Sequence, residues 1–216
     1  MRALTNRSGL HRRYPNRQRG VVLFFALIAL VVMSLAAVAL IRSVDTSTLI
    51  AGNLAFKQSA TTSGDSGVES AIAALNTIQI AMTNSNSNVL MDSNNTFNLN
   101  DAANGYYSNA DPSVILTASA TWASGSSKLV TADDGAGNQI RYIIQRMCRD
   151  ANQLVSKTNC LFSAAALDNN GQEVPLPSSV CQGTGCPVAG QSPQYRITSR
   201  IAGPANTFSY VQAFVY

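Results

Sequence analysis

Four cysteines carry the most reactive side chains of this 216-residue chain: Cys148, Cys160, Cys181 and Cys186. Their sulfur atoms admit two chemistries, a zinc site made by all four thiolates or two disulfide bonds. A zinc site needs closely spaced ligand pairs, and Cys148 and Cys160 are too far apart in the sequence to form one. Disulfides persist in oxidising compartments, and four cysteines allow three pairings. We expect the sequential pairing, because each pair then closes a short loop after a strand.

Imidazole chemistry depends on a single residue, since His11 is the only histidine in the chain. His11 lies in an arginine-rich leader, and a mature chain without that leader has no imidazole to serve as a base or a metal ligand. No paired-carboxylate, nucleophile-elbow or P-loop motif is present. We therefore expect no enzyme, no catalytic residue and no cofactor.

The acidic segment Ala132–Asn138, which reads ADDGAGN, is the one candidate for a calcium loop. An EF-hand loop requires ligands at alternating positions and a distal glutamate, and this segment has neither. Its glycines and its position between two β-rich segments are typical of a hairpin turn. We therefore interpret it as a turn and expect no metal site.

Gly20 and Val21 mark the boundary between the basic leader and an apolar segment that extends to Ile41 and contains one polar residue, Ser34. About 20 apolar residues span a bilayer as a helix. Six arginines precede the segment, so the N-terminus is expected in the cytoplasm and the rest outside the inner membrane. Three interpretations remain open. A signal peptide would be cut near Ala37–Ala39, a plain anchor would keep its leader, and a third kind of protein would be cut after Gly20 and keep the helix.

The formal net charge of +4 is misleading as an indication of nucleic-acid binding. Six of the fifteen basic residues lie in the leader, whereas all eleven acidic residues lie beyond it. Without the leader, nine basic residues face eleven acidic ones, a balance of −2. No basic patch remains to attract phosphates, and we expect no nucleic-acid partner.

These residues must be positioned by a long helix and a sheet. Helical spacing of apolar residues begins at Val68 and continues through Ile72, Leu75, Ile78 and Met82. The preceding segment Thr61–Gly67 contains two glycines, which leaves open either a break or one continuous, kinked helix.

After the helix, the Asn- and Ser-rich segment Thr83–Asp111 has a loop composition and is a candidate contact surface. Five segments are expected as strands: Ile115–Trp122, Lys128–Thr131, Ile140–Met147, Tyr195–Ile201 and Thr207–Tyr216. The sequence thus predicts an α+β fold in which one helix face packs on a mostly antiparallel sheet.

Three segments resemble a known family. Arg19-Gly20 followed by VVLFFALIAL resembles the class III leader of type IV prepilins. Ser47–Phe56 is similar to the segment that follows the anchor in PilX-type minor pilins, and Tyr195–Ala213 resembles the last two strands of that family. The resemblance covers both ends of the chain, whereas the middle, about residues 83 to 138, matches no family.

The resemblance implies a type IV pilin fold and four segments: a removed leader (1–20), a transmembrane or filament-core helix (21–42), its periplasmic continuation (43–82) and a periplasmic sheet domain (83–216). It also implies cleavage by a prepilin peptidase after Gly20 and N-methylation of Val21. The protein would reside in the inner membrane and then in a surface pilus. Its partners would be other minor pilins, the major pilin and a large tip adhesin.

Phe25 departs from the pattern of the family's major pilins, whose fifth mature residue is usually glutamate. An unpaired carboxylate in an apolar helix is costly, and a terminal subunit lacks a neighbour on one side. The resemblance and this residue together predict a subunit that caps or initiates a filament. Two alternatives stay open: a minor pseudopilin of a type II secretion system, and a membrane-anchored receptor or enzyme with one helix.

Overall fold

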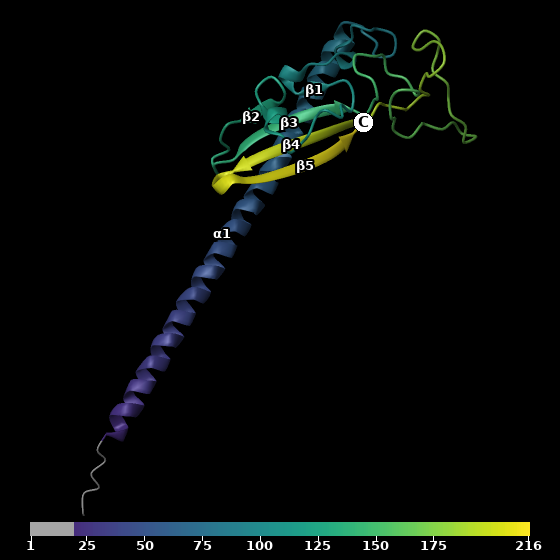
Figure 1. Cartoon of the computed structure of the whole chain (residues 1–216). Coiled ribbons are helices and arrows are strands. Elements are labelled where there is room, and N and C mark those ends of the chain that lie inside the picture. The colour runs from purple at the N-terminus through teal and green to yellow at the C-terminus, as the bar shows by residue number, and fades with distance from the viewer. Residues whose placement is uncertain (1–19) are drawn as a thin grey trace, which may run out of the picture. The chain divides into compact units, whose positions relative to one another are not determined.

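The computed structural model describes residues 20–216, so the leader residues 1–19, including His11, lie outside the described part of the chain. Its contacts divide the chain after Ala51 into two compact units. The first unit contributes only helix to the described structure, and the second, residues 52–216, contains the sheet (Figure 1).

A single helix, α1 (Val21–Asn84), extends through both glycines of the segment Thr61–Gly67 without a break. Its buried positions are spaced by three and four residues and are mostly small: Ala60, Gly64, Gly67, Ala71 and Leu75. This spacing places them on one face of the helix. Most of the predicted stripe is present too, because Val68, Ile78 and Met82 pack against the core cluster that contains Leu75. Ile72 is the exception and is 36% exposed.

The two glycines allow the helix to approach the sheet closely. A methyl group on Gly67 would lie 2.0 Å from Ser199 Oγ and 3.0 Å from Ile140 Cγ2, and one on Gly64 would lie 2.4 Å from Val211 Cγ2. Such distances are far below the 3.5–4.0 Å or so of a normal carbon contact. The glycines that weaken the helix by propensity are therefore required by its packing.

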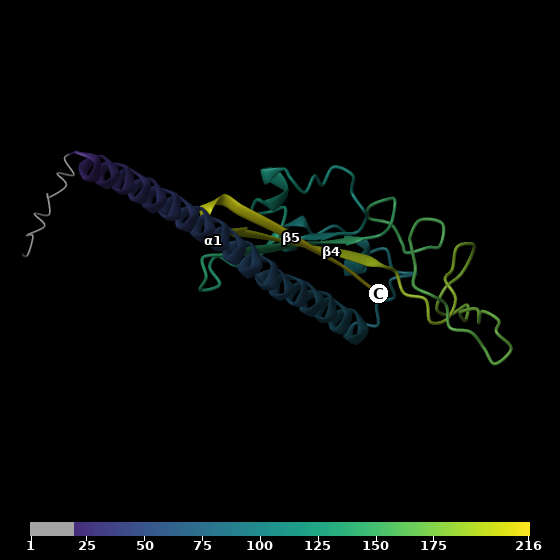
Figure 2. The same cartoon turned by 90° about the horizontal axis from the view of Figure 1, so that it is seen from below.

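The sheet is mixed, with strand order β1-β3-β4-β5. Its strands are β1 (Tyr106–Tyr107), β2 (Lys128–Thr131), β3 (Gln139–Arg146), β4 (Tyr195–Gly203) and β5 (Thr207–Val215). The pairs β2–β3, β3–β4 and β4–β5 are antiparallel, whereas β1 is parallel to β3. An α+β fold is thus present, and the sheet covers one side of α1 (Figure 2).

The predicted strand Ile115–Trp122 is wrong. This segment forms turns and a short 3-10 helix, η3 (Ser119–Trp122), and it pairs with no strand. Its β-prone residues instead cover the sheet face opposite α1, where Trp122, Tyr107 and Ile143 form a buried cluster. Hydrogen bonds from the Thr121 hydroxyl and the Trp122 indole to backbone carbonyls within the segment stabilise this cover.

The Asn- and Ser-rich segment after α1 is irregular, as predicted, but it is not only surface. It contains two 3-10 helices, η1 (Thr96–Asn98) and η2 (Ala102–Asn104), and then β1. Asn95 and Asn98 are 1% and 0% exposed, and Phe97 between them belongs to the main core cluster. The remaining short helix, η4 (Pro204–Asn206), connects β4 to β5.

Candidate functional site

The candidate processing site lies at the beginning of the described structure. Gly20 precedes α1 directly, and Val21 is the first helical residue. Nothing lies within 4 Å of where a side chain on Gly20 would begin. The boundary between Gly20 and Val21 therefore coincides with the start of the helix, where the Gly20 carbonyl accepts from Phe24 N at 3.4 Å.

The helical part of the first unit exposes every residue from Val21 to Ala51. One helix is long and apolar enough to cross a membrane, and its most apolar window has none of its residues buried. The lone polar side chain of the apolar segment, Ser34, donates to the carbonyl of Val31 at 2.8 Å. Since this bond lies within the helix, Ser34 leaves no unsatisfied donor in an apolar environment.

Phe25 lies on this exposed surface with 64% of its side chain exposed. Its ring packs edge-to-face against Phe24, with centroids 6.3 Å apart. Neither ring has a further aromatic partner among the described residues. The apolar surface around Phe25 is therefore available to lipid or to another subunit.

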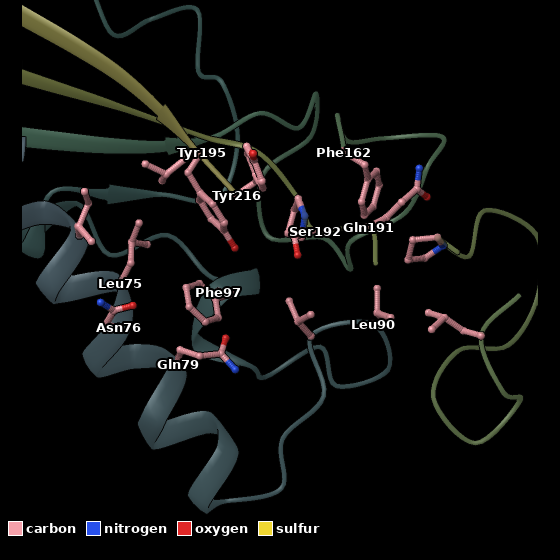
Figure 3. A pocket seen from close by; sticks show the side chains of 16 residues that line it. Leu75, Asn76, Gln79, Leu90, Phe97, Phe162, Gln191, Ser192, Tyr195 and Tyr216 are labelled. Atoms are coloured by element: carbon pink, nitrogen blue, oxygen red, sulfur yellow. The ribbon is translucent and has the colours of Figure 1, made fainter. Parts of the chain in front are cut away.

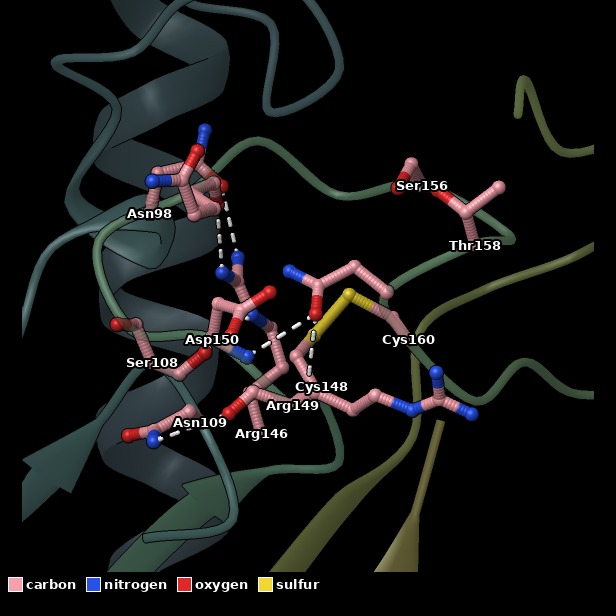
Figure 4. The surroundings of a disulfide bond; sticks show 12 residues. Asn98, Ser108, Asn109, Arg146, Cys148, Arg149, Asp150, Ser156, Thr158 and Cys160 are labelled. Carbon is pink, nitrogen blue, oxygen red and sulfur yellow. Dashed lines mark hydrogen bonds between the residues drawn. A yellow bond between two sulfur atoms is a disulfide. The ribbon is translucent and has the colours of Figure 1, made fainter. Parts of the chain in front are cut away.

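The structure joins Cys148 to Cys160 and Cys181 to Cys186, which is the sequential pairing. Backbone bonds flank the first disulfide on both sides, because Arg149 N donates to Asn159 O and Leu161 N donates to Met147 O. The surroundings of this disulfide are shown in Figure 4. The second disulfide closes a tight turn in the long irregular segment between β3 and β4.

Arg146, at the end of β3, is a fully buried charge that the sequence did not reveal. Its side chain is fully buried, and it donates to Ser108 O, Phe97 O, Asn98 Oδ1 and Gln153 O at 2.7–2.9 Å. Burial lowers the pKa of this guanidinium. Strand alternation is the sequence signal that could have indicated its burial, because Arg146 lies on the same face of β3 as Ile140, Tyr142 and Ile144.

These bonds give Arg146 a structural role. The four acceptors come from the Asn-rich segment, from the end of β1 and from the loop closed by the first disulfide (Figure 4). A buried cation without a carboxylate partner is tolerated only when all its donors find acceptors. Arg146 therefore fixes the Asn-rich segment to the sheet, and Asn98 serves as one of its acceptors.

A pocket of about 460 Å³ lies where α1, the Asn-rich segment and the loop before β4 meet (Figure 3). Leu75 and Phe97 line it together with Leu90, Phe162 and Tyr195. Burial raises the pKa of Tyr195 to about 12, so its hydroxyl stays protonated at neutral pH. The lining is mainly apolar and contains no Asp, Glu, His or Lys side chain.

The carboxylates of the candidate calcium loop, Ala132–Asn138, accept hydrogen bonds from the loop itself and from α1. Asp133 Oδ1 accepts from Gly135 N and Gly137 N, and Asp134 accepts from Ala136 N and Asn138. Asp134 Oδ2 also accepts from Ser63 Oγ of α1 at 2.5 Å. These hydrogen bonds hold the pKa of Asp134 well below its ordinary value. Within residues 20–216, no cluster of three potential metal-ligating side chains is present.

Comparison of the chain with family models, with curated proteins and with solved structures found no match.

Proposed function

We propose that this chain is a minor pilin of a type IV pilus, similar to the PilX type, and that it acts in the priming or tip complex of the filament. The observation that carries the proposal is the coincidence of three features at one position. The basic leader ends, the glycine occurs, and the apolar helix begins, all at Gly20 and Val21. Neither a signal peptide nor a plain anchor requires a glycine there.

The exposed helix surface supports an assembly role. Burying one large apolar side chain is worth about 1.5–3 kcal/mol, and α1 exposes eighteen of them before Ala51. Left in water, this surface would cost tens of kcal/mol, so it requires lipid before assembly and neighbouring subunits afterwards. A helix that is first a membrane anchor and then a filament core meets both requirements.

The sheet domain supports a location outside the cytoplasm. Both disulfides lie in residues 148–186, and the cytoplasm does not maintain such bonds. The arginines of the leader orient the chain so that these cysteines are exported. The proposed partners are other minor pilins, the major pilin and a tip adhesin, together with a prepilin peptidase for processing.

Mass spectrometry of the mature N-terminus tests the proposal. In a host that has a prepilin peptidase, the chain should begin at N-methylated Val21. Gly20→Leu should abolish cleavage, whereas Gly52→Leu should be processed normally. The two variants are matched, because neither glycine has a neighbour within 4 Å of an added side chain. An N-terminus at Leu40 would indicate a signal peptide, and an intact Met1 in the wild-type chain would indicate a plain anchor. Either result would refute the pilin assignment.

A further inference from the structure

The sheet face opposite α1 carries three arginines, Arg141, Arg196 and Arg200. Arg141 and Arg200 are direct cross-strand partners on β3 and β4, and Arg196 lies opposite Gln145. Like charges in directly opposed positions destabilise a sheet. Lys157–Glu173 is the one ion pair in the described part of the chain, so none of the three has a carboxylate within 4.0 Å. The positive charge on this face is not neutralised by the chain itself.

Two of these guanidinium groups each have a donor without a partner, although Arg196 Nη2 donates to Gln145 Oε1 of β3. The Nε atoms of Arg196 and Arg200 are buried and donate to no acceptor in the described chain. The guanidinium carbon of Arg200 lies 4.5 Å from the ring centroid of Phe208, on the neighbouring strand β5. The charge of Arg200 thus extends from β4 over β5, toward the outer edge of the sheet.

Strand β5 forms that outer edge and is unprotected. It has nine residues, TFSYVQAFV, without a charge, a proline or a glycine. No backbone hydrogen bond from residues 20–206 reaches it except those of the β4 pairing. Phe208 and Phe214 are 48% and 60% exposed beside the arginines. Monomeric proteins usually protect such an edge with charges, prolines or bulges, and this edge has none of them.

We propose that β5 accepts an extended segment of a partner protein as an additional strand, and that this segment carries Asp or Glu side chains facing Arg200, with Arg196 adding to the positive charge of the face. An added strand would lie about 4.8 Å from β5, within reach of the guanidinium that already lies over Phe208. The aromatic side chains next to the arginines supply the apolar contacts, as aromatic and arginine residues do at binding hot spots.

The positive charge of this sheet face favours an acidic partner over a second copy of this chain as the added strand. Pairing β5 with the β5 of another copy would place two arginine-bearing faces side by side without an acid between them, because β5 itself has no charged residue. An acidic segment instead supplies the missing carboxylates. The proposed strand addition involves only residues 107–215 and does not depend on pilus assembly.

Selection from a library of random decapeptides tests the inference. The full chain, held in detergent micelles, is the target, and empty micelles remove peptides that bind detergent. Peptides with Asp or Glu at alternating positions among β-branched and aromatic residues should be enriched. The double variant Arg196→Gln/Arg200→Gln should lose the preference for acids, Arg196→Lys/Arg200→Lys should retain it, and Arg149→Gln should serve as the matched control at an exposed site.

A selected peptide then separates strand addition from simple charge attraction. N-methylation of alternate backbone nitrogens on the edge-facing side should weaken binding about tenfold or more, since it removes the interstrand hydrogen bonds. Enrichment without acids, equal binding by the arginine-to-glutamine variant, or binding indifferent to N-methylation would overturn the proposal. The proposal would also be overturned if the free chain formed dimers at higher concentration and the peptide did not dissociate them.

Discussion

Replacing Gly67 by alanine tests the closest contact between α1 and the sheet. Alanine is favoured over glycine in a helix interior by about 1 kcal/mol, so propensity alone predicts a stabilised protein. The structure predicts the opposite sign. The added methyl would lie 2.0 Å from Ser199 Oγ, 2.9 Å from Ser199 Cβ and 3.0 Å from Ile140 Cγ2.

The size of the loss in stability depends on whether the residues around the added methyl group can move away. Overpacking a core typically costs about 1–3 kcal/mol. Ser199 and Ile140 belong to β4 and β3, the paired central strands of the sheet, so neither backbone can withdraw easily. A cost in the upper half of that range, reduced by the gain in helix propensity, predicts a net loss of about 1–2 kcal/mol in the free energy of unfolding.

The chain provides its own probe and controls for this measurement. Trp122 is the only tryptophan and is 4% exposed, so its fluorescence follows urea unfolding of the sheet domain in detergent. Gly52→Ala, which adds a methyl with no neighbour within 4 Å, should stabilise by up to about 1 kcal/mol. Ser199→Ala should reduce the cost of Gly67→Ala, because it removes the hydroxyl that the methyl would meet and that has no hydrogen-bond partner.

The reasoning would be refuted if Gly67→Ala stabilised the protein as much as Gly52→Ala does. That result would mean that α1 lies farther from β4 than the structure places it. Equal costs of Gly67→Ala with and without Ser199→Ala would show that the contacts with Ser199 Cβ and Ile140, and not that with the serine hydroxyl, determine the loss.

Three further predictions concern separate parts of the chain. Immunogold labelling of sheared pili should place wild-type protein at filament ends, and Phe25→Glu should extend the label along the shaft; dense wild-type label along the shaft would refute the tip assignment. Non-reducing peptide mapping should recover only Cys148–Cys160 and Cys181–Cys186, and removing the first and second bond should cost about 3 and 2 kcal/mol; a peptide linking Cys148 to Cys181 would contradict this. Because the folded-state pKa of Asp134 is lowered, its contribution to stability is complete above its ordinary value of 3.8 and is lost as pH falls below it; Asp134→Asn should flatten the acid limb of a plot of stability against pH, and an unchanged limb would exclude this carboxylate as its cause.

The sequence predicted the helix and most strands because their patterns are local. Apolar spacing from Val68 to Met82 and alternation in residues 195–201 identify buried faces without knowledge of any partner. It did not determine whether the helix continues through Gly64 and Gly67, because propensity describes an isolated helix. Only the position of Ser199 and Val211 shows that those two positions require glycine.

The remaining errors also concern long-range contacts. Residues 115–122 have the composition of a strand, but strand pairing depends on a free neighbour, and this segment covers a sheet face instead. The burial of Asn98 could not be read from an asparagine-rich composition, since its side chain bonds Arg146, which lies 48 positions later. For the candidate site, the sequence predicted the pairing of the cysteines, and the roles of Gly20 and Phe25 stay predictions. The exposed edge of β5 and the arginines without a carboxylate partner required the sheet order.

The position of β4 in the sheet has a consequence for the order of synthesis and folding. This central strand pairs with β3 on one side and β5 on the other, yet it is encoded within the last 22 residues of the chain. While the ribosome is still producing residues 147–194, β3 has no antiparallel partner on that side, and the glycine face of α1 has no β4 to pack on. The second unit therefore completes its sheet only after residues 195–215 have been synthesised. A premature stop anywhere before residue 195 would leave β3 without β4 and would expose the face of α1 that carries Gly64 and Gly67.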